Sequence, residues 1–115
     1  MKIQDEIRAG SFELIWSYVL DYENSKNPFE ERRKQIHEWR HLSSIQVQAS
    51  DKIIEASNNL MSIGMKKYDA LHIACAIEGE SDYFLTTDDK VLNKNNKIEE
   101  ITIIDLFDFI KEMDL

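Results

Sequence analysis

Carboxylates flank the apolar middle of the stretch KKYDALHIACAIEGESDYFLTTDDKVL, which runs from Lys66 to Leu92. Asp69 precedes the apolar run ALHIACAI, and Asp88 and Asp89 follow the apolar run YFL. Carboxylates in such places do one of two things. They cap helices by accepting backbone N–H groups, or they bind a hard divalent cation such as Mg²⁺. The residue types alone allow both.

The elements that must position these acids alternate between strand and helix. In the first half we expect a strand near Glu13–Ser17, a helix over Tyr18–Ser25, a helix from Pro28 capped by Asn27, and a weak strand over IQVQ. In the second half we expect helices over SDKIIEASNNLMSIG, ALHIACAIEG, DDKVLNKN and DLFDFIKEM, with strands over DYFLTT and EITIID. This alternation predicts an α/β fold with a mostly parallel sheet flanked by helices.

In such sheets, functional sites lie outside the carboxyl ends of the strands. The strand DYFLTT would place Thr86, Asp88 and Asp89 at that edge. Asp21 and Glu23 follow the earlier strand by one or two helical turns. Asp69 opens a helix and has to be tested for the same edge. Three acidic segments converging there would bind a divalent cation through oxygen atoms.

Three motifs resemble the PIN-domain family, the small metal-dependent ribonucleases that include the VapC toxins of toxin–antitoxin pairs. The block KYDALHIACAIEGESDYFLTTDDKVL resembles the C-terminal signature of the family, an Asp opening the DALHIA helix and an apolar strand ending in Thr-x-Asp. SYVLDYEN resembles its earlier acidic motif, a Ser followed six residues later by a Glu. ITIIDLFDFI resembles its last strand and terminal helix. The resemblance extends from about Phe12 onward and implies a three-layer PIN-like fold.

The resemblance also implies roles for particular residues. Glu23, Asp69 and Asp88 match three metal-site acids of the family, Asp89 matches a fourth position less closely, and Thr86 matches a hydroxyl beside the site. The implied cofactor is Mg²⁺ or Mn²⁺, and the implied reaction is phosphodiester hydrolysis of RNA. In that chemistry the metal activates a bound water, and a carboxylate accepts its proton.

One part of the family pattern is missing. PIN domains open with an apolar strand that ends in Asp, whereas this chain opens with the polar segment MKIQDEIRAG. We therefore expect residues 1–115 to form a single PIN-like domain lacking the first central strand and its Asp, with weak or absent activity. A homodimer is expected because the open sheet and the apolar ALHIACAI helix need cover. The alternative is a non-catalytic interaction or dimerisation protein, or a pseudo-enzyme that binds an antitoxin-like partner.

The composition limits the kind of protein and the cellular compartment that we expect. The chain has 115 residues, of which 43% are hydrophobic, and this is enough for a core without disulfides. The single cysteine, Cys75, lies in the apolar run ALHIACAI and is expected to be buried. These features and the absence of a membrane-length apolar run predict a cytoplasmic protein without membrane contact. A net charge of −8 argues against long-range attraction to RNA, although RNA remains an implied partner.

One segment, ERRKQIHEWRH, collects basic side chains, and Arg33, His37, Arg40 and His41 would share a helical face. That face would either contact phosphates or be solvated and balanced by the glutamates of the same segment. The buried stripe of this helix is expected to consist of Phe29, Ile36, Trp39 and Leu42. His72, one turn after Asp69, is either a catalytic base or a packed or partner-facing side chain, and we favour the second.

Overall fold

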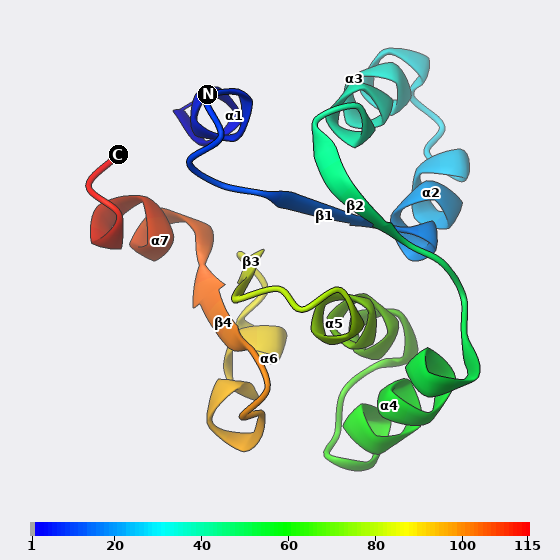
Figure 1. Cartoon of the computed structure of the whole chain (residues 1–115). Coiled ribbons are helices and arrows are strands. Elements are labelled where there is room, and N and C mark those ends of the chain that lie inside the picture. The colour runs from blue at the N-terminus through cyan, green and yellow to red at the C-terminus, as the bar shows by residue number, and fades with distance from the viewer. Residues whose placement is uncertain (1) are drawn as a thin grey trace. The chain divides into compact units, whose positions relative to one another are not determined.

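The computed structural model describes residues 2–115 as two compact units that divide between Ala49 and Ser50. Each unit contains helices and one pair of parallel strands (Figure 1). The predicted mixed α/β class and the parallel pairing are therefore confirmed. The three-layer PIN-like arrangement and the assignment of residues 1–115 to a single domain stay predictions. Over residues 2–115, no helix has the length and apolar character needed to cross a membrane.

The first unit contains three helices and two strands within its described residues. In chain order these are α1 (Lys2–Arg8), β1 (Leu14–Ser17), α2 (Tyr18–Ser25), α3 (Glu30–Arg40) and β2 (Ser43–Val47). β1 and β2 pair in parallel, with Ser17 opposite Val47 at the carboxyl end. Ser17 then caps α2, because its hydroxyl accepts the N–H of Leu20 at 3.4 Å. The predicted strand near Glu13–Ser17 and the helix Tyr18–Ser25 are confirmed.

The start of α3 differs from the prediction. The helix begins at Glu30 rather than at Pro28, and Phe29 is its N-cap residue. Asn27 instead closes a turn around Pro28, because its side-chain oxygen accepts the N–H of Phe29 at 3.1 Å. Phe29 therefore precedes the helix and is not part of its predicted buried stripe. Its side chain is 63% exposed, with the guanidinium carbon of Arg32 5.6 Å from the ring centroid.

The rest of the predicted stripe on α3 lies at the boundary of the core. Ile36, Trp39 and Leu42 are half-buried, and none of them is fully enclosed. Asn24 of α2 holds this helix, because its side-chain amide donates to the carbonyl of Arg33 at 3.0 Å. This hydrogen bond attaches α3 to α2.

The second unit holds the segment with acids at both ends. Its elements are α4 (Asp51–Ser62), α5 (Lys67–Glu78), β3 (Tyr83–Thr86), α6 (Asp89–Leu92), a 3₁₀ turn (Asn95–Lys97), β4 (Thr102–Asp105) and α7 (Leu106–Glu112). β3 and β4 pair in parallel over their whole lengths. Ser50 caps α4 by accepting the N–H of Ile53 at 3.3 Å. The sequence allows either Ser50 or Asp51 as this cap, and the structure selects Ser50.

The core of this unit is built on α4 and α5, which lie side by side (Figure 1). Ile53 of α4 and Ile73 of α5 are fully enclosed, and Cys75 is 1% exposed, which confirms its predicted burial. No residue between Ala70 and Ile77 is exposed. α4 therefore supplies part of the cover that the apolar ALHIACAI helix was predicted to need.

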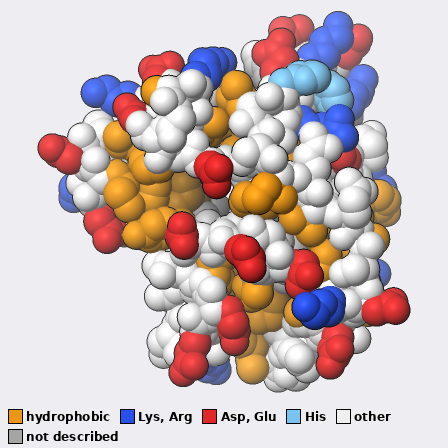
Figure 2. Space-filling model, in the orientation of Figure 1, with side chains coloured by type: hydrophobic (Ala, Val, Ile, Leu, Met, Phe, Trp, Pro, Cys, Tyr) orange, Lys and Arg blue, Asp and Glu red, His pale blue; other side chains and the backbone are white. Residues whose placement is uncertain are grey.

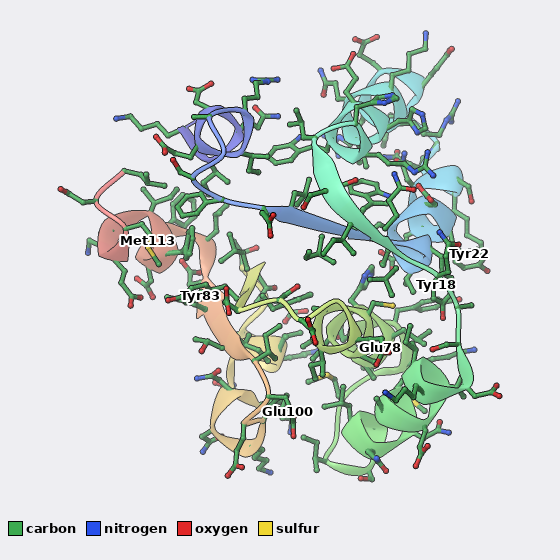
Figure 3. All side chains as sticks on the ribbon, viewed as in Figure 1. Tyr18, Tyr22, Glu78, Tyr83, Glu100 and Met113 are labelled. Atoms are coloured by element: carbon green, nitrogen blue, oxygen red, sulfur yellow. The ribbon has the colours of Figure 1, made fainter. Side chains whose placement is uncertain are left out.

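Helix α7 packs against the β3–β4 strand pair through an aromatic contact. The ring of Tyr83 on β3 meets that of Phe109 on α7 edge-on, with ring centroids 5.2 Å apart. Tyr83 lies beside the ribbons of β4 and α7 (Figure 3). Phe109 is only 5% exposed. This contact packs α7 against β3.

A matched pair of isoleucines tests the importance of the α4–α5 packing. Replacing the enclosed Ile73 by alanine should lower the free energy of unfolding by about 2–5 kcal/mol, because a cavity remains in the core. Replacing Ile54, which is 48% exposed on α4, should lower it by less than about 1 kcal/mol. Urea unfolding followed by circular dichroism measures both values. Equal losses in the two variants would contradict the packing described.

Candidate functional site

The parallel pairing of β3 and β4 brings two acidic strand ends together. Thr86, the last residue of β3, stands opposite Asp105, the last residue of β4. Asp88 follows Thr86 by two residues. We call Thr86, Asp88 and Asp105 the carboxyl edge of the second unit. It is the kind of edge at which parallel sheets place their functional sites.

At this edge Asp88 is held by backbone hydrogen bonds. The hydroxyl of Thr86 accepts the N–H of Asp88 at 3.1 Å. Oδ1 of Asp88 accepts the N–H of Lys90 at 2.9 Å, which makes Asp88 the N-cap of α6. Asp89 lies in the first turn of α6 and is exposed. The sequence predicted a helix starting at one of these two acids, and capping is one role that Asp88 has in the structure.

Asp105 has the same role on the neighbouring strand. Its Oδ1 accepts the N–H of Phe107 at 2.8 Å and the N–H of Asp108 at 3.3 Å, so it caps α7. Asp105 was not among the residues predicted for the site. A signal was present, because EITIID, like DYFLTTDD, is an apolar strand that runs into an acid. What the sequence could not supply was that the two strands pair in this register.

Asp69 does not cap its helix. Lys66 is the N-cap residue of α5, and Asp69 is the third residue of the helix, in its first turn. The sequence allows an N-cap or a first-turn position for Asp69, and the structure places it in the first turn. Asp69 is half-buried, and so is His72 one turn further along the helix.

Glu23 and Asp21 belong to the first unit, where both lie exposed on α2. Asp21 is engaged there by two partners. Its Oδ1 accepts the indole N–H of Trp16 at 2.9 Å, and its Oδ2 lies 3.5 Å from Nε of Arg40. Asp21 therefore joins β1, α2 and α3.

A metal ion needs several ligands in one place, and the described residues do not supply a ready set. Over residues 2–115, neither unit contains a group of three or more His, Cys, Asp or Glu side chains arranged to hold a metal ion. In the second unit, capping uses Oδ1 of both Asp88 and Asp105. The metal-binding roles of Glu23, Asp69, Asp88 and Asp89 stay predictions.

Comparison of the chain with known protein families, with curated proteins and with solved structures found no match. The functional assignment therefore depends on the motifs of the sequence and on the geometry of the carboxyl edge.

The capping role of Asp88 can be measured by substitution. Asp88→Ala should lower the free energy of unfolding by about 1 kcal/mol, because the N–H of Lys90 loses its acceptor. Asp88→Asn should leave it nearly unchanged, because Asn is an equally good N-cap residue. Asp89→Ala, at the adjacent acid, is the control and should cost at most about 0.5 kcal/mol. If Asp88→Ala proves as stable as the unmodified chain in urea, Asp88 does not act as a cap.

Proposed function

We propose that the chain is a PIN-like domain related to the metal-dependent ribonucleases of toxin–antitoxin systems, and that it acts on RNA in the cytoplasm with Mg²⁺ or Mn²⁺. The observation that carries the proposal is the carboxyl edge. Thr86 ends β3 and Asp88 follows it by two residues, while Asp105 ends the neighbouring strand β4. Asp69 adds a carboxylate in the first turn of the buried helix α5.

The residues have distinct roles in this proposal. Asp69, Asp88 and Asp89 are the metal ligands that we propose in the second unit. Glu23, on α2 of the first unit, keeps the metal-binding role that the resemblance implies. Capping occupies only Oδ1 of Asp88, and a carboxylate has about four acceptor sites, so its second oxygen still suits a cation. The hydroxyl of Thr86 accepts one hydrogen bond and keeps its own proton to donate. We assign to Thr86 the orientation of a phosphate oxygen or a water.

Two features indicate that the activity is weak. Neither unit, within residues 2–115, presents three metal-ligating side chains in one group, so a cation has to reorganise the site before it binds. The net charge of −8 also repels RNA phosphates at long range. Both features lower the activity expected of the protein relative to a complete site.

Cleavage of a labelled single-stranded RNA tests the proposal. With Mn²⁺ we expect slow cleavage that EDTA abolishes and that falls by about tenfold or more in Asp69→Asn, because one metal ligand is weakened. Asp82→Asn is the matched control, since Asp82 is an exposed acid of the same unit. It should cleave like the unmodified protein. Cleavage that persists unchanged in Asp69→Asn would exclude the proposed site.

The second candidate is a non-catalytic protein that forms a homodimer or binds an antitoxin-like partner. The observation that favours it is apolar exposure on the second unit. Phe107, in the first turn of α7, is 67% exposed, and Tyr83 on β3 is 37% exposed. Asp88, just beyond β3, and Asp105, the last residue of β4, already have a structural role as helix caps. An exposed aromatic side chain is a frequent anchor of protein interfaces.

The oligomeric state, measured by sedimentation or light scattering, tests the second candidate function. If the protein is a dimer that uses α7, Phe107→Asp should convert it to a monomer, because a charge would be buried at the interface. Phe29→Asp is the matched control in the first unit, where the side chain is 63% exposed. It should leave the dimer intact. A dimer that survives Phe107→Asp would exclude α7 as its interface.

A further inference from the structure

The C-terminal end of α3 contains a histidine pair that neither candidate function uses. Residues 37–41 read His-Glu-Trp-Arg-His, so the two histidines are four residues apart. Side chains at this spacing are neighbours on one face of a helix. The pattern H-E-x-x-H on a helix is one that binds Zn²⁺ through its two imidazoles in metalloenzymes. The pattern alone is weak, so the geometry of the pair has to support it.

In the structure the two imidazoles are adjacent. Their ring centroids lie 5.5 Å apart, and the ring planes are nearly perpendicular, at 88°. His41 is the C-cap residue of α3, and its φ of −68° and ψ of −18° keep it in the right-handed helical region. The helical spacing therefore extends through both histidines. Both are exposed, and Figure 2 shows histidine side chains gathered on the surface over α3.

The separation suits a shared ion. Two imidazoles that bind one tetrahedral zinc, each with a Zn–N distance of about 2.0–2.1 Å, place their ring centroids about 5 Å apart. The observed 5.5 Å is close to that value. Small side-chain rotations would therefore turn one nitrogen of each ring toward a common point, and exposed side chains make such rotations readily.

The neighbouring cations are already held by other groups. Nε of Arg40 lies 3.5 Å from Asp21, and its Nη2 donates to Gln46 at 3.1 Å. Nζ of Lys34 lies 3.4 Å from Glu30. Arg33 donates to the carbonyl of Asn27 at 2.9 Å. These contacts direct the positive groups toward other partners, which reduces their repulsion of a cation between the imidazoles.

We propose that His37 and His41 form a two-histidine site for a divalent transition metal of the Zn²⁺ type. Imidazole nitrogen favours Zn²⁺, Ni²⁺ and Cu²⁺, whereas carboxylate oxygen favours Mg²⁺ and Mn²⁺. The site is thus chemically distinct from the carboxyl edge. Catalytic zinc sites use three protein ligands, and over residues 2–115 no third His, Cys, Asp or Glu joins this pair. The remaining positions go to water, and the site binds metal without catalysis.

Zinc titration of the full chain, by competition with a chelating dye, tests the proposal. One Zn²⁺ should bind per chain at this site, and His37→Gln or His41→Gln should each weaken binding by about tenfold or more, because the second ligand then no longer adds to the first. The chain has three histidines, so His72→Gln is the matched control and should bind like the unmodified chain. Zn²⁺ should also raise the Tm of the unmodified chain and of His72→Gln.

Ring packing alone would also bring the two imidazoles together, and the titration separates the two accounts. If packing is the whole explanation, His37→Gln and His41→Gln bind Zn²⁺ as the unmodified chain does. Zn²⁺ then changes the Tm of the unmodified chain and of all three variants by the same amount. That result would overturn the proposal. Circular dichroism should show that the three variants keep the fold, since a loss of Zn²⁺ binding can then be attributed to the loss of an imidazole ligand.

Discussion

The second unit depends on the parallel pairing of β3 with β4. Because the strands run in the same direction, α6 and α7 both begin at one edge, just beyond Thr86 and Asp105. The first backbone N–H groups of each helix have no partner within the helix. Asp88 and Asp105 supply the acceptors. The same geometry that gathers acids for a cation therefore also gives those acids a structural use, and the proposed chemistry has to work with the oxygens that capping leaves.

Local features of this unit could be predicted from the sequence. The Ser50 cap, the burial of Cys75 and the start of α6 at Asp88 and Asp89 each follow from a few neighbouring residues. Asp105 was missed because its place beside Thr86 depends on a pairing between strands that are distant in the chain. The start of α3 was missed for a local reason, because Asn27 stabilises a turn around Pro28 instead of capping the helix.

The two proposed metal sites differ in what the protein supplies. At the carboxyl edge, oxygen ligands come from separate elements, so their number and distance depend on tertiary packing. On α3, both nitrogen ligands come from one helix, and their spacing is fixed by backbone geometry alone. The shared helical face of the two histidines therefore follows from the sequence alone, whereas the acidic site depends on the tertiary fold. The affinity of the histidine site for metal is limited, because it has two protein ligands rather than three or four.

Titration with paramagnetic Mn²⁺, followed by amide signals in ¹H–¹⁵N NMR spectra, tests the central proposal of a weakened oxygen site most directly. Mn²⁺ broadens signals near its binding site. We predict that the amides of Asp69, Thr86 and Asp88 broaden first, and that the effect saturates only near millimolar concentrations, about the range of weak oxygen sites. Broadening that spares these three residues would contradict the proposed site. Saturation at micromolar Mn²⁺ would contradict the claim that the oxygen site binds the cation weakly.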